Sequence, residues 1–152
     1  METIIQRARI ENLNELIQWR MEVLHHVFML SDVADMTELE AANRHYYEKQ
    51  LPRGEHIACF ARQASETIGC GGICIYDEMP SPDNPSGRSA YLMNIYCREQ
   101  YRHQGIGRQI VGWLIREARL QEITKIYLET SVEGRKLYES MDFKDMAGMM
   151  KL

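Results

Sequence analysis

The sequence has no long apolar run and no excess of charge of one sign, and both absences narrow the possible functions. No stretch of apolar residues approaches the length that crosses a bilayer, so we expect no membrane partner. The formal net charge is −4, which gives no basic surface over the whole chain, so nucleic acid is not an expected partner. Charged and polar side chains interrupt the first seven residues, so we expect that they do not form a secretory signal peptide.

Cysteine is also scarce, and the four cysteines are not spaced for a disulfide or for zinc. Cys59, Cys70, Cys74 and Cys97 each lie in an apolar, strand-like context, where a thiol usually serves as a small buried side chain. Cys70 and Cys74 would lie roughly 13 Å apart along an extended strand, which is too far for a disulfide. No histidine accompanies them at the spacing of zinc ligands, so we expect no metal site. We expect all four thiols to be reduced and the protein to be cytoplasmic.

The few prolines are concentrated in one place, and this concentration marks a loop. Three of the four fall between Asp77 and Gly87, which predicts a loop, either an ordered loop at the rim of a site or a plain connector. The remaining composition is ordinary for a globular protein, with 45% hydrophobic and 26% charged residues. A chain of 152 residues with this content is expected to form a single domain over residues 1–152.

The spacing of apolar residues predicts a mixed α/β protein with the element order β-α-α-β-β-β-α-β-α-β. Strands are expected at Thr3–Arg9, His56–Arg62, Thr67–Tyr76, Ser89–Cys97 and Lys125–Glu129, with a last strand beginning at Phe143. Helices are expected after Asn12, from Thr37 to Leu51, at Gly105–Leu120 and at Glu133–Met141. The strand–helix–strand unit in the second half requires a parallel pair, whereas the hairpins before it are antiparallel. A mixed sheet with helices on both faces follows.

The most informative segment is Arg102–Gly107, which lies between the Ser89–Cys97 strand and the Gly105–Leu120 helix. Two glycines at a strand-to-helix turn let the backbone come close to a ligand. The free N–H groups and the positive end of the helix dipole then form an anion site. The segment therefore predicts a site for phosphate groups.

Two other phosphate-binding motifs compete for this segment. A P-loop needs Gly-Lys-Ser/Thr after its glycines, and Gly107-Arg108-Gln109 does not supply it. A dinucleotide fingerprint needs a third glycine, where Ile110 stands, although Glu129 has the place of its acidic partner. The dinucleotide alternative stays open at this point as the weaker one.

The segment resembles the signature of the GNAT superfamily of acyl-CoA-dependent N-acetyltransferases. The family has Arg/Gln-x-x-Gly-x-Gly/Ala after a strand, which corresponds to Arg102-x-x-Gly105-x-Gly107. Its Leu-Tyr-x-x-x-Gly-Phe ending is similar to Leu137–Phe143, with Asp142 where glycine is usual. Asp tolerates left-handed backbone better than most residues, so we expect this turn to form. Glu99 replaces the family's usual proline, which is a mild departure.

The resemblance implies a fold and a cosubstrate site. The fold is a central, mostly antiparallel sheet with one parallel pair that splays apart, and with helices on both faces. The cosubstrate is acetyl-CoA, with backbone N–H groups on its pyrophosphate and an added-strand contact along its pantetheine arm. The implied cosubstrate-binding residues are Ile95, Tyr96, Cys97, Arg102, His103, Gln104, Gly105, Ile106, Gly107 and Arg108.

The resemblance also implies a mechanism of direct attack by an amine on the thioester. The Ile95 N–H would polarise the carbonyl, as in an oxyanion hole, and Tyr138 would protonate the departing thiolate. The general base stays open among Glu129, Glu78 and Asp77, each of which ends a strand. Tyr46, Tyr47 and Tyr91 are candidates to line the acceptor pocket, although aromatic residues at such spacing are more often part of a core.

We therefore expect an enzyme, an N-acetyltransferase that moves acetyl from acetyl-CoA to a primary amine, without a metal. The acceptor would be a small-molecule amine or a peptide N-terminus, and a homodimer is possible. The alternative from another class is a catalytically silent acyl-CoA-binding or sensor module. Such a module would keep the Gly105/Gly107 site without depending on Tyr138.

Overall fold

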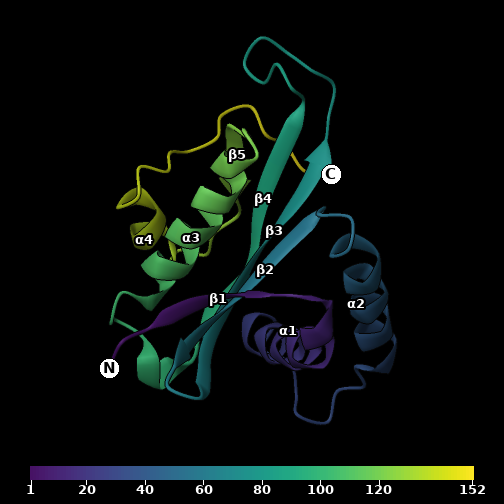
Figure 1. The fold of residues 1–152 in the computed structure, drawn as a ribbon, viewed down its shortest axis with the longest axis vertical. Helices are drawn as coiled ribbons and strands as arrows, with labels where there is room; N and C mark the ends of the chain where they lie inside the picture. Colours follow the sequence, from purple (N-terminus) through teal and green to yellow (C-terminus); the bar gives the residue numbers. More distant parts are fainter.

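Five strands form one sheet in the order β1-β2-β3-β4-β5, so each strand pairs with its neighbour in sequence (Figure 1). In the computed structural model, which describes residues 1–152, the strands are β1 (Ile4–Ala8), β2 (His56–Gln63), β3 (Glu66–Asp77), β4 (Arg88–Cys97) and β5 (Lys125–Leu128). The first three pairs are antiparallel and β4–β5 is parallel. The predicted mixed sheet with one parallel pair is confirmed.

Helices cover both faces of this sheet, as the sequence predicts. The helices are α1 (Leu13–Val27), α2 (Thr37–Gln50), α3 (Ile106–Leu120) and α4 (Arg135–Glu139), with short 3₁₀ turns η1 (Ile10–Asn12) and η2 (Glu99–Tyr101). α1 and α2 lie on one face, and α3 lies on the other as the crossover between β4 and β5 (Figure 1). None of these helices combines the length and the apolar character that a membrane span requires.

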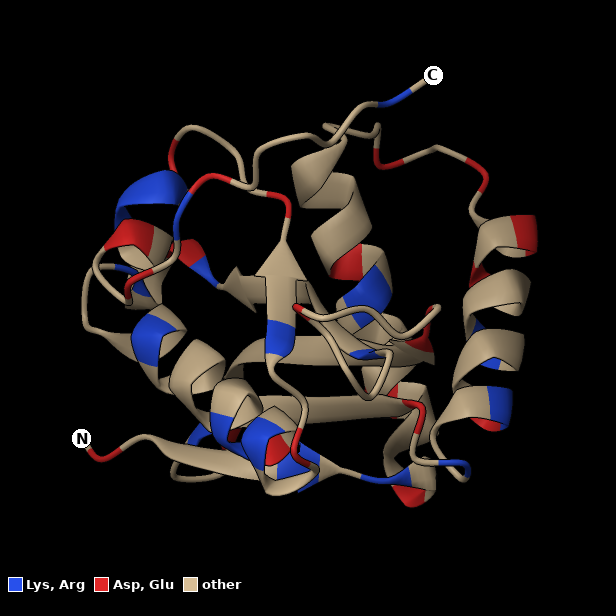
Figure 2. Ribbon diagram, turned by 90° about the horizontal axis from the view of Figure 1, so that it is seen from above, with Lys and Arg blue, Asp and Glu red and all other residues tan.

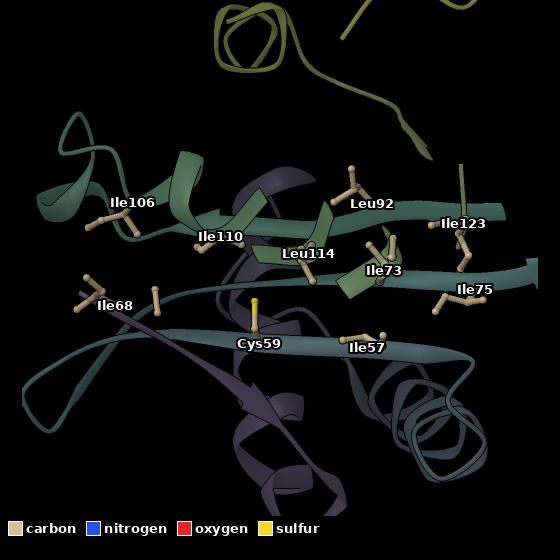
Figure 3. Close-up of a cluster of buried hydrophobic side chains, with 13 residues drawn as sticks. Ile57, Cys59, Ile68, Ile73, Ile75, Leu92, Ile106, Ile110, Leu114 and Ile123 are labelled. Carbon is tan, nitrogen blue, oxygen red and sulfur yellow. The ribbon is translucent and has the colours of Figure 1, made fainter. Parts of the chain in front are cut away.

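The core has two layers, because the sheet separates two groups of buried side chains. On the α3 face the predicted helical stripe of Ile106, Ile110, Leu114 and Ala118 is buried against the strands. Figure 3 shows the α3 side chains of Ile106, Ile110 and Leu114 on the side of the sheet to which Ile68 and Ile73 of β3 belong. On the other face Trp19 and Tyr47 of α1 and α2 pack with Phe60 of β2. Acidic and basic residues are interspersed over the whole ribbon (Figure 2).

Glycines in β3 bring α3 directly onto the strand. A Cβ at Gly71 would lie 2.5 Å from Cγ2 of Ile110, and a Cβ at Gly69 would lie 2.7 Å from the carbonyl oxygen of Tyr96. The sequence predicts a bulge or a close approach at these glycines, and both are present. The helix therefore occupies the space that side chains would take.

The expected strand beginning at Phe143 does not form, which corrects the predicted element order. Residues 144–152 have no helix or strand, so β5 is the edge of a sheet with five strands instead of six. α4 ends in a left-handed turn at Asp142, with φ 68°, and the Phe143 ring packs against the core. Beyond it Met149, Met150 and Leu152 are exposed. These apolar side chains have no part of the core to pack against. A strand here would bury neither of its faces, so the pattern of side chains does not stabilise one.

The proline-rich loop between β3 and β4 is ordered by its own hydrogen bonds, as expected. The Glu78 N–H donates to the Gly87 carbonyl at 2.8 Å, and Ser81 and Asn84 form an isolated bridge. Gly87 has φ 70°, and a Cβ there would lie 2.3 Å from the Glu78 carbonyl oxygen. The loop stands at the start of β4 and extends beyond the sheet (Figure 1).

Candidate active site

The parallel strands β4 and β5 part after four paired residues. Ser89 to Leu92 pair with Lys125 to Leu128, and β5 ends there. β4 continues through Met93 to Cys97 with no strand on that side. The backbone of Ile95, Tyr96 and Cys97 therefore lies along an open edge, where an extended ligand can pair as an added strand.

A β-bulge in β4 lies at the point where the strands part. Gly72 pairs with Met93 and Cys70 pairs with Tyr96. Between these two pairs the chain advances by two residues in β3 and by three in β4, so β4 has one extra residue. Asn94 has a left-handed backbone, with φ 60°, which Asn adopts more readily than most residues. A bulge turns backbone groups out of the ladder and re-aims them. The peptide groups around Ile95 are therefore displaced from regular pairing at the mouth of the opening.

The side chain of Asn94 is held from the α1/α2 face. Arg20 of α1 donates from Nη1 to Asn94 Oδ1 at 3.0 Å and from Nε to Asn43 Oδ1 of α2 at 3.0 Å. The Cys70 thiol lies 3.4 Å from the Asn94 carbonyl oxygen. The Arg20 guanidinium thus links the β4 bulge to α1 and α2. The sequence alone did not reveal this contact.

The N-terminus of α3 presents unpaired backbone donors, as the glycine motif predicts. The N-cap Gly105 has φ 78°, and the first helical bond runs from the Gln109 N–H to the Gly105 carbonyl at 3.1 Å. No backbone hydrogen bond outside regular elements is donated by residues 103–108. His103, Gln104 and Gly105 are exposed, and nothing lies within 4 Å of a Cβ built on Gly105. This end of the helix fits a diphosphate.

The arginines of the motif brace the turn. Arg102 donates from Nε to the Cys97 carbonyl at 3.0 Å, lies 3.1 Å from Nε2 of His26, and stacks over the Tyr96 ring at 5.8 Å. Arg108 donates to the Ser140 hydroxyl at 2.9 Å and so joins the start of α3 to the end of α4. Both side chains keep further N–H groups for an anion.

The second motif glycine and Ile106 serve the packing of α3. A Cβ at Gly107 would lie 3.1 Å from Cδ2 of Leu137, so the glycine lets α4 approach α3 closely. Ile106 is buried in the α3-side core and anchors the first turn. The two glycines therefore have different roles, because Gly105 supplies a backbone conformation and Gly107 supplies space.

Tyr138 of α4 is half-buried, and its hydroxyl donates to no protein group. Its ring packs edge-on against Phe143 at 5.7 Å, and the left-handed Asp142 between them forms the expected turn. Burial raises the pKa of Tyr138, so the phenol stays protonated at neutral pH. Tyr138 and Glu129 both line a cavity of about 980 Å³ between β5, the second half of α3, α4 and residues 141–146.

The structure places the two candidate bases Glu129 and Glu78 in different environments. Glu78 forms an ion pair with Lys125, accepts from Asn84 Nδ2 at 3.3 Å, and has its pKa lowered chiefly by Lys125. Glu129 is exposed directly after β5 and has no ion-pair partner. Burial is the largest cause that raises the pKa of Tyr91, and the charge of Glu129 is the second largest. Glu78 is therefore held by Lys125 of β5 and by Asn84 of the loop, whereas Glu129 forms no ion pair and contacts Tyr91.

Tyrosines from three adjacent strands form one wall on the α1/α2 face. Tyr91 of β4 is in register with Tyr127 of β5, and their rings stack 4.9 Å apart. The hydroxyl of Tyr76 of β3 bonds that of Tyr127. Sequence reasoning found Tyr91 but missed Tyr76 and Tyr127, because the strand register decides which residues are neighbours.

Next to this wall lies a buried polar cluster under α2. The Tyr46 hydroxyl lies 2.8 Å from His56 Nδ1 and 3.1 Å from Cys74 Sγ. Burial lowers the pKa of His56 to about 4, so the imidazole is neutral. Tyr46 therefore belongs to a structural cluster at the edge of the tyrosine wall. All four cysteines are free thiols, and no three His, Cys, Asp or Glu side chains lie together as metal ligands.

Comparison with known proteins gives a family match and similar folds. The acetyltransferase (GNAT) family model matches residues 13–143 of the chain, and no curated protein matches it. A predicted acetyltransferase from Clostridium acetobutylicum, solved with acetyl-CoA, is 23% identical with a TM-score of 0.88, and the match covers 99% of this chain and 96% of that one.

Two further solved structures share the fold over the full chain. A GCN5-related N-acetyltransferase from Ralstonia eutropha is 18% identical with a TM-score of 0.83, and the match covers 99% of this chain and 98% of that one. Glucosamine-6-phosphate N-acetyltransferase from Arabidopsis thaliana is 16% identical with a TM-score of 0.74, covering 100% and 98%. These likenesses establish the fold.

Proposed function

The chain belongs to the GNAT acetyltransferase family, and from that premise we propose that it transfers an acetyl group from acetyl-CoA to a primary amine. The observation that carries the proposal is the opening between β4 and β5 beside the unpaired N-terminus of α3. An acyl-CoA needs both features, because its diphosphate seeks N–H donors and its pantetheine arm is an extended, amide-bearing chain. The Clostridium relative, solved with acetyl-CoA, supports this cosubstrate.

The residues divide the binding task between two segments. The N–H groups from Gln104 to Arg108 would hold the diphosphate, with Arg102 and His103 at the rim. The backbone of Ile95, Tyr96 and Cys97 would pair with the pantetheine arm along the open edge of β4. When bound, acetyl-CoA supplies the thioester that an amine attacks.

The chain's own groups would stabilise charge and move protons at that thioester. The Ile95 N–H, re-aimed by the bulge, donates to the carbonyl oxygen as negative charge develops on it. Tyr138 donates its proton to the departing thiolate, a role that suits a phenol held protonated by burial. Glu129 accepts the proton of the amine, directly or through water, since Glu78 is engaged by Lys125.

We place the acceptor on the tyrosine wall of Tyr76, Tyr91 and Tyr127, which lies on the sheet face next to the bulge. It would be a small-molecule amine or a peptide N-terminus. The free state of all four thiols supports a cytoplasmic location.

The test is calorimetry of the protein with acetyl-CoA, with NAD as the control, followed by a thiol-release assay over an amine library. We expect micromolar binding of acetyl-CoA alone and release of free CoA with at least one amine. Preference for NAD would contradict the cosubstrate. Tight acetyl-CoA binding without turnover on any amine would instead favour the acyl-CoA-binding module.

A further inference from the structure

Arg20 of α1 lies between α2 and the β4 bulge and carries a charge that no carboxylate balances. Its side chain is half-buried and donates to two neutral amide oxygens, Oδ1 of Asn43 and Oδ1 of Asn94, each at 3.0 Å. These bonds use two of the five N–H groups of the guanidinium, and no protein group accepts from the other three. Because a guanidinium stays charged at neutral pH, Arg20 keeps both a positive charge and free donors.

The carboxylates of α1 are engaged by other arginines. Glu15 is paired with Arg62 at 2.9 Å, and Glu22 is paired with Arg98 at 2.9 Å. Arg20 takes part in no ion pair. A partly desolvated charge is stabilised by a counter-charge, so the free N–H groups of Arg20 favour an anionic ligand.

Arg20 is also close to both parts of the proposed acceptor site. It bonds the side chain of Asn94, and the next residue along the chain, Ile95, has the N–H proposed to polarise the thioester carbonyl. Its charge reaches the buried cluster next to the tyrosine wall as well. Burial is the largest cause of the lowered pKa of His56, and the charge of Arg20 is the second. The guanidinium therefore faces the region where an acceptor on the wall would meet the thioester.

We propose that Arg20 binds a carboxylate of the acceptor, so that the acceptor is a small amine that also carries a carboxylate, as an α-amino acid does. The inference rests on the proposed acetyl transfer to an amine and names the substrate class. A single positive charge among neutral groups balances one carboxylate, whereas a phosphomonoester carries about two negative charges.

The chemistry of an α-amino acid fits this position. One carbon joins its amine to its carboxylate, so a carboxylate on Arg20 holds the amine near the bulge. The amine nitrogen forms an amide bond to the acetyl carbon as the carbon–sulfur bond of the thioester breaks, and the proton lost by the amine is balanced by the proton gained by the CoA thiol. A peptide N-terminus has no carboxylate at this distance, so the site favours a free amino acid.

The test measures CoA release with pairs of acceptors that differ only in this carboxylate, namely the L-amino acids and their carboxamides. The proteins are the wild type, Arg20→Gln, Arg20→Lys and the control Arg53→Gln, which removes an exposed arginine without any partner in the structure. For at least one amino acid, we expect the wild type and the control to show a kcat/KM roughly ten- to a hundredfold above that for its carboxamide.

The variants should change this ratio in a graded way. Arg20→Gln should lose most of the preference for the acid, whereas Arg20→Lys should keep part of it, because an ammonium group also attracts a carboxylate. A displaced bulge would lower kcat for the acid and the carboxamide alike and would leave their ratio unchanged. The ratio therefore separates carboxylate binding from the contact between Arg20 and Asn94.

The outcomes distinguish this inference from the proposed function. If the wild type acetylates an amine but uses no amino acid better than its carboxamide, the carboxylate site is wrong and the acetyl transfer stands. An Arg20→Gln protein that keeps the full ratio would also overturn the site. Absence of CoA release with every amine would overturn both proposals. The wild-type ratio tests the site by itself, so the result does not depend on the folding of a variant.

Discussion

At the scale of single residues, the site depends on a few side chains whose surroundings fix their chemical state. Tyr138 keeps its proton because burial raises its pKa, and Glu78 keeps its charge because Lys125 lowers its pKa. Asn94 holds a left-handed backbone that only a few residue types accept, and Arg20 fixes its side chain.

Replacing Tyr138 by Phe tests the general acid. The ring would still pack against Phe143, so fold and acetyl-CoA binding should survive. Turnover should fall by roughly a hundred- to ten-thousand-fold, which is the usual size of general-acid effects. Steady-state kinetics with an identified amine measures this. Unchanged kcat would remove Tyr138 from the proposed mechanism.

Arg20 bonds Asn94 in the β4 bulge, and we call this contact the clamp. Replacing Arg20 by Ala tests whether the clamp positions the bulge. Loss of the bond to Asn94 should lower kcat by roughly ten- to a hundredfold, because small displacements of reacting groups are costly. The KM for acetyl-CoA should change little, since the N–H groups proposed to hold the diphosphate lie at α3, away from Arg20.

The matched control for the clamp is Asn43→Ala, which removes the other partner of Arg20 and leaves the Asn94 bond in place. Arg20→Lys should not rescue kcat, because an ammonium group does not reproduce the two-pronged contact. Equal kcat in Arg20→Ala and the control would show that the clamp does not position the bulge.

At the scale of elements, α3 is the part on which the fold and the site both depend. Its buried stripe fills the core under β3 and β4, while its first turn carries the unpaired N–H groups. The glycines of β3 allow this contact because they leave room for Ile110 and Leu114. The distance between α3 and the strands is therefore set by residues of both elements.

Replacing Gly71 by Ala should destabilise the protein by about 1–3 kcal/mol. The new methyl group would lie 2.5 Å from Ile110 Cγ2 and 3.1 Å from Leu114 Cδ1, inside a packed core. The matched control is Gly112→Ala in the middle of α3, where a Cβ meets only ordinary contacts at 3.8 and 3.9 Å.

Gly112→Ala should stabilise the protein by about 0.5–1 kcal/mol, because glycine is unfavourable inside a helix. Urea unfolding measures both variants. Opposite signs are expected, and a neutral Gly71→Ala would show that α3 can move away from the sheet.

At the scale of the whole molecule, the buried cluster under α2 makes folding sensitive to acid. Burial lowers the pKa of His56 to about 4 in the folded protein, from about 6.5 in the unfolded chain. Between these values the unfolded chain binds a proton that the folded protein does not. Stability should therefore fall by about 3 kcal/mol as the pH drops from about 6.5 to about 4, with no contribution above that window.

Urea unfolding of the wild type and of His56→Gln at pH 7 and pH 4.5 checks this dependence. The variant should be less stable at pH 7, because it loses the contact with Tyr46, but should lose less stability on acidification. Parallel losses in both proteins would show that other groups cause the acid sensitivity.

The sequence by itself determined the features that depend on neighbouring residues along the chain. The spacing of apolar residues predicted the buried stripe of α3, and the strand–helix–strand order predicted the parallel β4–β5 pair. The Gly105–Gly107 turn predicted the unpaired N–H donors at the start of α3. The left-handed turn at Asp142 was also predictable, because it depends on the backbone preference of one residue.

Only the tertiary structure decided the features that depend on strand register and on contacts distant in sequence. It paired Tyr91 with Tyr127, brought Arg20 to Asn94 across 74 positions, and engaged Glu78 with Lys125. It also left residues 144–152 without a strand, although their sequence permits one. The physical reason is that local preference sets what a segment is able to form, whereas the available partners decide what it does form.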